Sequence, residues 1–303
     1  MTARPIRVLI DTDPGLDDAV GILYALADRR FSVEAITSVA GNIGLPVTTR
    51  NVGGLLSVMG RGDVPYAAGA AGPLAGDGLN EVAIHGADGL GGVTLPDPLT
   101  APDAVGASGC LAKVLSQVPM GALTVLALGP LSNLALLARD APEAYARIGR
   151  IIAMGGTIEE RGNAGPHAEF NIASDPVAAQ MVFAGPVPVT LIPLDVTRQV
   201  RATTEDLDRL NATGTVAAKL SADMIRAYFV GSAERTSRPL HDPCVMLMAL
   251  LPELFGTRPM RLSVDCVTDV GRLVPSQNGP TIDVAMTVDA PAALDALWRG
   301  LGS

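Results

Sequence analysis

Aromatic residues and cysteines are both scarce in this sequence. Phe, Trp and Tyr together make up 3% of the 303 residues, so the chain offers few rings on which a flat ligand could stack. The three cysteines, Cys110, Cys244 and Cys266, have no paired spacing. This pattern excludes a disulfide framework and a cysteine-rich zinc site, and it indicates reduced thiols and a cytoplasmic protein.

Positive charge is also in short supply. The chain has 22 Lys and Arg against 31 Asp and Glu, a formal net charge of -9, and no basic run. Because proteins that bind nucleic acid neutralise phosphates with clustered Lys and Arg, this balance excludes a nucleic acid polymer as the partner. Near the N-terminus the apolar run Val8-Leu9-Ile10 is interrupted at once by Asp11, so we expect no signal peptide.

One hydrophobic run is long enough to cross a membrane, but it is not continuous. Residues 114–138 carry no charge, yet Pro119, Gly121 and Gly129-Pro130 interrupt them. Such breaks predict the end of a helix, a buried strand over Leu123–Leu128, a turn, and a second helix over Leu131–Arg139. We therefore expect no contact with a membrane.

Short apolar runs alternate with helical patterns along the first 200 residues. The predicted strands are Arg7–Ile10, Val33–Val39, Leu123–Leu128, Ile151–Met154 and Val189–Ile192. The predicted helices between them are Asp17–Asp28, Val47–Met59, Ser108–Val118, Leu131–Arg139 and Pro176–Phe183. Strands joined through helices form βαβ units, and strands that are apolar on both faces need helices on both sides. The pattern predicts an α/β fold with an open, mostly parallel, doubly wound sheet and flanking helices.

The last third of the chain begins helical and then returns to strands. Helices are predicted over Thr204–Leu210, Thr215–Val230, Pro243–Leu251 and Pro291–Leu301, with strands over Arg261–Val267 and Thr281–Thr287. No repeat or linker divides the chain, so we predict a single domain over residues 1–303. The Gly-rich segment Gly69–Pro98 is too long for an ordinary connection, which favours a functional loop.

The most informative segment contains four aspartates within eight residues: Asp11, Asp13, Asp17 and Asp18. It lies where the first predicted strand hands over to a helix, at the carboxyl edge of the sheet where ligands bind in open α/β folds. Carboxylates this close repel one another unless protons or a cation neutralise them. Oxygen-rich clusters suit the hard cations Ca²⁺ and Mg²⁺. The segment therefore predicts a metal site.

Three other interpretations of this segment are weaker. An EF-hand loop counted from Asp11 fails, because Gly15 stands at position 5, Leu16 at position 6 and Ile22 at position 12. A phosphatase loop of the Asp-x-Asp type uses Asp11 and Asp13 but leaves the later pair unexplained. Helix capping explains only that later pair.

Polar residues also follow the other predicted strands. Asn42 follows the second strand and Asn133 the third, while Met154 precedes a segment that contains Asn163, Glu169 and Asn171. The pair His241-Asp242 precedes the helix that begins at Pro243, and His85 lies in the Gly-rich segment. Taken singly, each Asn and Asp fits a turn or a helix cap equally well, and each of these two His fits a structural role. His167 has no such context and is predicted to be structural.

Together these segments resemble the nucleoside hydrolases of the inosine-uridine type. The resemblance rests on Asp11–Ala19, Gly41-Asn42, His85-Gly86-x-Asp88-Gly89, Met154-Gly155-Gly156, Asn163 with Glu169-Phe170-Asn171, and His241-Asp242-Pro243. These motifs occur in order from Asp11 to Asp242, and the opening acidic motif is the most specific. The resemblance implies a Ca²⁺-dependent enzyme that cleaves the N-glycosidic bond of ribonucleosides, giving free base and ribose.

The resemblance also implies a role for each site residue. The metal ligands it implies are Asp13, Asp18, Asp242 and the main-chain carbonyl of Leu128. The ribose-binding residues it implies are Asp17, Asn42, Asn163, Glu169 and Asn171, with Met154 lining the pocket. His85 would contact the base, and Asp11 would orient the loop. Asp13 would act as the general base and His241 as the acid that protonates the leaving base.

Two other function classes remain open from the sequence. A haloacid-dehalogenase-like phosphatase would use Asp11 as its nucleophile together with Mg²⁺, and a non-catalytic protein would bind ribonucleosides without turnover. The ring that stacks on the base is also open, with Tyr228 and Phe229 as candidates. As a nucleoside hydrolase, the protein would be a cytoplasmic homodimer or homotetramer that acts on a small ribonucleoside in ribonucleoside catabolism and salvage.

Overall fold

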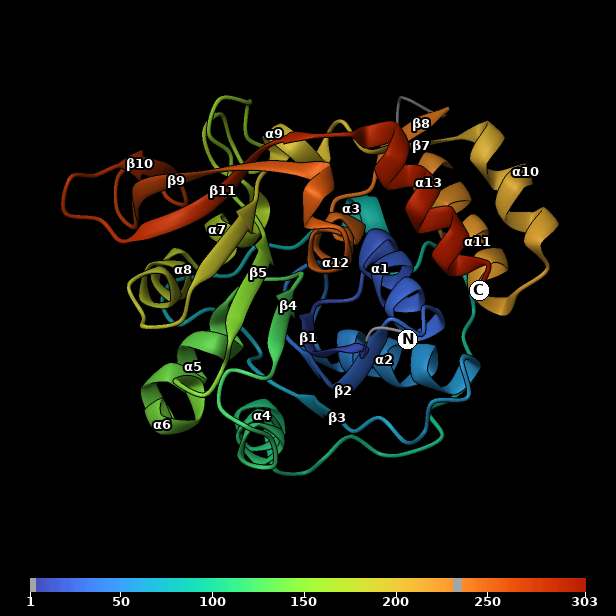
Figure 1. Cartoon of the computed structure of the whole chain (residues 1–303), viewed down its shortest axis with the longest axis horizontal. Helices are drawn as coiled ribbons and strands as arrows, with labels where there is room; N and C mark the ends of the chain where they lie inside the picture. The colour runs from blue at the N-terminus through green and yellow to red at the C-terminus, as the bar shows by residue number, and fades with distance from the viewer. Residues whose placement is uncertain (1–3, 231–235) are drawn as a thin grey trace.

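A nine-stranded sheet forms the centre of the computed structural model, which describes residues 4–230 and 236–303 (Figure 1). Its strand order is β10-β9-β11-β6-β5-β4-β1-β2-β3. The strands are β1 (Ile6–Thr12), β2 (Phe31–Ser38), β3 (Tyr66–Ala68), β4 (Thr124–Ala127), β5 (Arg150–Met154), β6 (Val189–Ile192), β9 (Phe255–Val264), β10 (Leu273–Pro275) and β11 (Thr281–Val288). The pairs from β3 to β11 along this order are parallel, whereas β9 pairs antiparallel with both β11 and β10.

Helices cover both faces of the sheet (Figure 1). One layer contains α1 (Leu16–Ala27), α2 (Leu45–Val58), α10 (Thr204–Thr213), α11 (Val216–Val230), α12 (Pro243–Leu250) and α13 (Ala290–Leu301). The other contains α4 (Gly106–Ser116), α5 (Ser132–Asp140), α6 (Pro142–Tyr145), α7 (Phe170–Ser174) and α8 (Pro176–Phe183). The short elements α3 (Val82–His85), α9 (Leu194–Thr197), β7 (Arg201–Thr203) and β8 (Ser237–Pro239) lie in connections, and β7 pairs antiparallel with β8.

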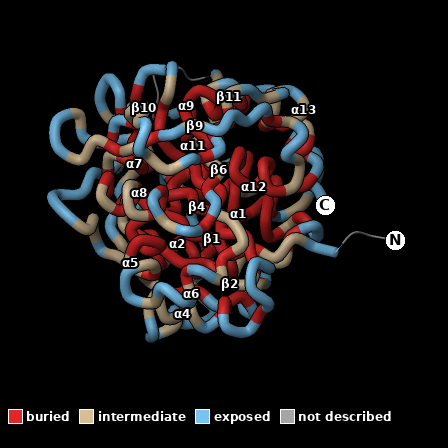
Figure 2. Tube along the Cα trace, turned by 60° about the vertical axis from the view of Figure 1, so that its left-hand side comes forward, coloured by how far each residue is buried: buried red, intermediate tan, exposed pale blue. Residues whose placement is uncertain are grey.

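The strands separate two hydrophobic clusters because successive side chains point to opposite faces. In β1, Val8 and Ile10 pack with α1 and α12 in the first cluster, while Leu9 packs with α4 and α5 in the second. The path of the chain through β1, β4, α1 and α12 is accordingly buried (Figure 2). Burial on both faces explains why Val8–Ile10 in β1 and Val125–Ala127 in β4 are apolar at every position.

The predicted fold class is confirmed, and the predicted elements of the sheet core are present with small differences at their ends. Val189–Ile192 and Pro176–Phe183 have the predicted bounds, whereas the predicted strand at Arg261–Val267 begins six residues earlier, at Phe255. The antiparallel pairing of β9 and the short elements were not predicted. Among residues 4–230 and 236–303, no helix is long and apolar enough to cross a membrane. A single domain over residues 1–303 stays a prediction.

The order of the strands creates a crevice beside β1. Chain connections run from β1 towards β2 and β3 on one side and through β4, β5 and β6 on the other, so the order reverses between β1 and β4. In open α/β sheets, ligands bind outside the carboxyl ends of the strands at such a switch point. The backbone N–H of Leu128, just after β4, donates to the carbonyl of Asp11 at 2.8 Å. The acidic segment after β1 therefore lies in this crevice.

Candidate active site

Hydrogen bonds shape the acidic loop between β1 and α1. Asp18 lies in the first turn of α1, where its Oδ2 accepts from the backbone N–H of Gly15 at 3.0 Å and its Oδ1 accepts from Thr12 Oγ1 at 2.7 Å. Asp11 points elsewhere: its Oδ1 accepts from Thr37 Oγ1 at 2.5 Å and from Asn133 Nδ2 at 2.7 Å. Asp11 thus anchors the loop to neighbouring elements, which agrees with its predicted orienting role and with no role as an exposed nucleophile.

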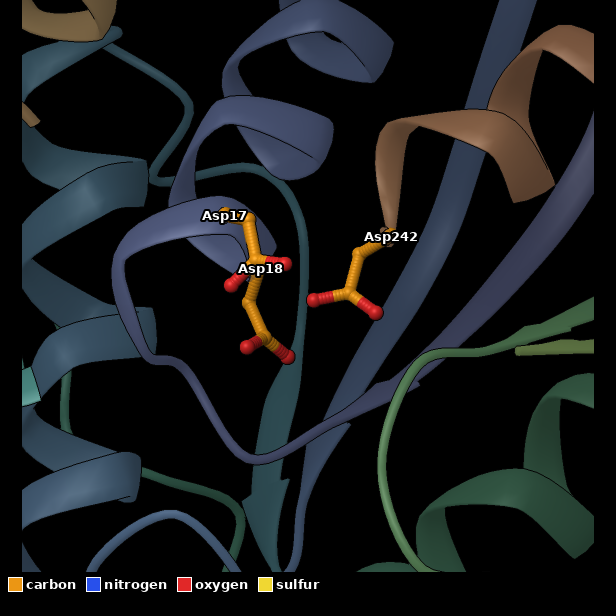
Figure 3. Close-up of side chains that lie close together, drawn as sticks. All are labelled: Asp17, Asp18 and Asp242. Atoms are coloured by element: carbon orange, nitrogen blue, oxygen red, sulfur yellow. The ribbon is translucent and has the colours of Figure 1, made fainter. Parts of the chain in front are cut away.

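Asp242 brings a further carboxylate to the loop from the far end of the sequence. It precedes Pro243 at the start of α12, which packs against α1. Figure 3 shows Asp17 and Asp18 on α1, with the Asp242 carboxylate directed towards them. One carboxylate oxygen from each of these three residues lies within 4.8 Å of the others.

These carboxyl groups are buried and destabilise one another's charged forms. Burial and the charge of Asp18 together raise the pKa of Asp17 to about 7. Burial and the charge of Asp18 also raise the pKa of Asp13 and of Asp242 well above the usual range. A cation bound among them would remove this repulsion and favour the ionised forms.

The donor set fits a hard cation. Asp13 Oδ1 is buried and has no hydrogen-bond partner among the described residues, so it is an oxygen available for a ligand bond. Asp13 Oδ2 accepts from the backbone N–H of Asn42 at 2.7 Å. Gly41 and Gly129 flank this carboxylate so closely that a Cβ on either would collide with it. Among the described residues the clustered donor groups are carboxylates, with no thiol or imidazole among them, and such oxygen donors suit calcium or magnesium better than zinc.

A pocket with a volume of about 380 Å³ opens above the acidic loop. It is lined by Asp17, Asn42, Glu81, Ile84, His85, Leu128, Met154, Asn163, Glu169, Phe170, Asn171, Leu194, Arg198, Arg201, Tyr228, Arg238, Pro239, His241 and Asp242. The structure thus brings together every predicted site residue except Asp13 and Asp18, which lie beneath the lining in contact with it. A pocket of this size accommodates a small organic ligand.

Two predicted ribose-binding amides also hold the site together. Asn42 Nδ2 donates to Asp18 Oδ2 at 3.0 Å and to the carbonyl of Asp13 at 3.2 Å. Asn171 Nδ2 donates to the carbonyl of Leu128 at 2.6 Å and to that of Met154 at 3.2 Å. Their amide nitrogens are engaged with the protein, so a ligand hydroxyl would meet their Oδ1 atoms as acceptors.

Glu169 and Asn163 line the pocket from the segment that follows β5. Glu169 caps α7, where it accepts from the backbone N–H groups of Asn171 and Ile172, and it also accepts from that of Gly156. Burial nevertheless raises its pKa to about 7. Asn163 Oδ1 accepts from the backbone N–H of Phe170 at 2.8 Å, which joins the two segments.

His85 is buried and His241 is half-buried, and the low pKa of each favours the neutral ring. Burial lowers the pKa of His85 to about 4, and burial together with the charges of Arg198 and Arg238 lowers that of His241 to about 3. His85 Nδ1 accepts from the backbone N–H of Leu16 at 3.0 Å, so its neutral ring has its proton on Nε2. His241 Nδ1 lies 2.7 Å from Thr197 Oγ1, which can donate to it and favour the same tautomer. An imidazolium, the form that the predicted acid role implied, is therefore disfavoured at His241.

Three arginines that line the pocket were not predicted from the sequence. The sequence also left open whether Tyr228 or Phe229 is the aromatic residue of the site. Tyr228 lines the pocket and stacks on His85 with ring centroids 5.9 Å apart, whereas Phe229 packs in the core. Arg238 lies over the Tyr228 ring, and Arg198 and Arg201 also line the pocket. No motif marks these arginines, because they come from separate segments that only the fold brings together.

Comparisons with known proteins agree with this arrangement. The family model for inosine-uridine preferring nucleoside hydrolases matches residues 8–295. The pyrimidine-specific ribonucleoside hydrolase RihA of Citrobacter koseri is 38% identical over 307 residues, which cover 98% of each chain. Among solved structures, the plant nucleoside hydrolase PpNRh1 has a TM-score of 0.91 at 32% identity, with 99% of each chain covered. A purine-preferring ribonucleoside hydrolase from Gardnerella vaginalis has a TM-score of 0.90 at 29% identity, with 98% of each covered.

The buried carboxyl groups predict that the metal-free protein loses stability as the pH rises. Asp17 and Glu169 have folded-state pKa values of about 7, whereas an unfolded carboxyl titrates near 4. Between these values the folded state binds more protons than the unfolded state, so the free energy of unfolding falls, on the order of a few kcal/mol. We expect chelator-treated protein to have a lower urea midpoint at pH 8 than at pH 5. A midpoint that stays constant or rises would contradict the raised pKa values of these two groups.

Proposed function

Because this chain belongs to the inosine-uridine preferring nucleoside hydrolase family, we propose that it hydrolyses pyrimidine ribonucleosides to free base and ribose in a calcium-dependent reaction. The chain is a ribonucleoside hydrolase, an enzyme that acts on N-glycosidic bonds. One observation carries the proposal: the buried carboxylates of α1 and Asp242 converge beneath a pocket lined with carboxylates and amides.

Calcium is the cation that this donor set would bind. Asp13, Asp18 and Asp242 would hold it together with the carbonyl of Leu128, which already accepts from Asn171 and offers its second lone pair. Calcium takes six to eight oxygen ligands in flexible geometry, so carboxylates, a carbonyl and ligand hydroxyls can serve together. When bound, it would orient a water molecule and lower its pKa.

The carboxylates and amides of the pocket would bind the ribose. Asp17 would accept from a hydroxyl beside the metal, and the Oδ1 atoms of Asn42 and Asn171 would accept from others. Glu169 and Asn163 would bind the remaining hydroxyl, with Met154 against the sugar face. Asp13 would accept the proton of the attacking water as general base. The nearby carboxylates would also stabilise the positive charge that develops on the sugar as the base departs.

His241 and His85 would face the departing base as neutral donors. Each can present Nε2–H to the pocket, because Nδ1 is paired with Thr197 in one case and with the backbone of Leu16 in the other. His241 would then assist departure by donating a hydrogen bond from Nε2–H to the base, without transferring a proton as an imidazolium would. His85 would contact the base, together with the Tyr228 ring stacked on it.

The proposed preference for pyrimidines is supported by relatives that are named for that activity. RihA enzymes described as pyrimidine-specific are 37–38% identical over nearly the whole chain. We further propose a cytoplasmic homodimer or homotetramer that serves ribonucleoside catabolism and salvage. The phosphatase alternative is disfavoured because Asp11, its required nucleophile, is buried and is not among the residues that line the pocket. The non-catalytic alternative would not need the buried carboxylate cluster.

The substrate class can be tested with a panel of nucleosides. We expect uridine and cytidine to release equal amounts of ribose and free base, with kcat/KM at least about tenfold above that of inosine. A difference of this size corresponds to about 1.4 kcal/mol in transition-state binding. Ribose is measured as reducing sugar and the base by chromatography. Faster hydrolysis of inosine than of uridine would refute the pyrimidine preference without touching the hydrolase activity.

The calcium requirement predicts the effect of metal removal. Exhaustive chelation should abolish uridine hydrolysis, and Ca²⁺ should restore it better than Zn²⁺ because the donors are all oxygens. The matching measurement is elemental analysis of the active protein, in which we expect one Ca²⁺ per chain. Full activity after chelation, or stoichiometric zinc in the purified enzyme, would refute the calcium proposal.

Replacement of Asp13 by Asn tests the general base. The variant keeps the side-chain size but loses the proton acceptor and one ligand charge, so kcat for uridine should fall by at least ~10²–10⁴-fold. Asp208→Asn serves as the matched control, because Asp208 is exposed on α10, away from the pocket. Comparable rates for the two variants would exclude Asp13 from the reaction.

A further inference from the structure

We propose that Arg238 contacts the nucleobase and stabilises the negative charge that develops on it as the N-glycosidic bond breaks. This inference rests on the proposed function of the same site and adds a catalytic residue on the leaving-group side. None of the sequence motifs includes Arg238, and the family resemblance assigns it no role.

The fold places the Arg238 guanidinium in the part of the pocket that contains the aromatic ring. Arg238 is the central residue of β8, where it pairs with Ala202 of β7. Its guanidinium carbon lies 4.0 Å from the centroid of the Tyr228 ring. The same ring stacks on His85, with an angle of 27° between the two planes. Arg238 and His85 therefore both pack on the Tyr228 ring, which lines the pocket together with the residues proposed to bind ribose.

The positive charge of Arg238 reaches the reacting region. It contributes to lowering the pKa of His85 in α3, the same residue on which the Tyr228 ring stacks. A guanidinium stays charged throughout the pH range in which the protein folds.

The other two pocket arginines are tied to the pocket walls. Arg198 pairs with Glu160 at 3.0 Å and donates to the carbonyls of Arg161 and Gly162, so it fastens the segment that leads to Asn163. Arg201 donates to the hydroxyl and the carbonyl of Ser237, which joins β7 to β8. The Arg238 guanidinium lies over the Tyr228 ring, which lines the pocket beside His85.

The chemistry of the leaving group explains why a fixed cation is useful there. When the bond between C1′ and the base nitrogen breaks, its electron pair stays on the base, and the charge spreads to the pyrimidine carbonyl oxygens. The water oxygen bonds to C1′ and Asp13 receives one water proton. This proton then passes through solvent to the departed base, which leaves Asp13 ionised again. Arg238 would donate hydrogen bonds to a carbonyl oxygen while this charge develops, when such bonds are strongest.

We expect loss of Arg238 to slow hydrolysis most for substrates whose base is a poor leaving group. Uridine needs stabilisation of its departing base, whereas p-nitrophenyl riboside has a leaving group that departs readily as an anion. We expect Arg238→Met and Arg238→Gln to lower kcat/KM for uridine by ~10²-fold or more, the effect of one lost anion-stabilising donor. The same variants should lower it for p-nitrophenyl riboside by less than about fivefold, since the metal and ribose sites are unchanged.

Two further variants test whether the charge of Arg238 matters and whether loss of any arginine has the same effect. Arg238→Lys keeps a positive charge and should retain more uridine activity than either neutral variant, although it loses the planar fork. Arg226→Met is the control, because Arg226 is exposed on α11 and pairs with Asp223; it should match the wild type on both substrates. Turnover of p-nitrophenyl riboside by each variant reports that the protein is folded and that its ribose site is intact.

Three results would overturn the inference. Equal losses on both substrates would mean that Arg238 supports the fold of the pocket instead of the leaving group. Unchanged uridine hydrolysis in both neutral variants would remove Arg238 from the reaction. In these two cases the wild type hydrolyses both substrates, so the proposed function stands. A wild-type protein that hydrolyses neither substrate would overturn the proposed function, and this inference with it.

Discussion

The mutual repulsion of buried carboxylates is the constraint on which the rest of the site depends. Asp13, Asp17, Asp18 and Asp242 are all buried within the crevice at the end of β1, where their charges cannot be screened by water. Protons relieve this repulsion at low pH, but a bound cation relieves it at the pH at which a carboxylate must act as a base. The same burial that makes the metal-free site costly therefore gives a bound cation its affinity.

Many polar contacts of the site can be understood as support for this cluster. Thr12, Gly15 and Asn42 donate to Asp18, and Asn42 also donates to Asp13, so the loop keeps its shape while one Asp13 oxygen stays unpaired among the described residues. The residues proposed to bind ribose surround the cluster from α1, the loop after β2 and the segment after β5. On the proposed leaving-group side, the neutral histidines would supply hydrogen-bond donors, and Arg238 would supply positive charge.

Local sequence patterns predicted the parallel core of the sheet and the acidic loop, because both depend on neighbours in the chain. Apolar runs indicate strands covered on both faces, and four aspartates where a strand meets a helix predict an ion site from local sequence alone. The partner of that loop, Asp242, could be placed only through a resemblance to known enzymes. Arg238 and Thr197 lie in ordinary surroundings in the sequence, and only the fold brings Arg238 to the pocket and Thr197 to His241. Likewise, only the fold places Tyr228, and not Phe229, in the pocket lining. The low pKa of His241 also depends on burial and on positive charges near its ring. Arg238 is close to it in the sequence, but the fold brings Arg198 and Arg201 from a separate segment.

The most direct test of the metal site is to locate the cation by diffraction from crystals grown with Ca²⁺. We predict one calcium ion per chain, about 2.3–2.6 Å from oxygens of Asp13, Asp18 and Asp242 and from the carbonyl of Leu128. Anomalous scattering would distinguish the ion from a water molecule. An acidic cluster that contains only water at saturating calcium, with the protein still active, would contradict a calcium-dependent site, as would an ion bound away from these four residues.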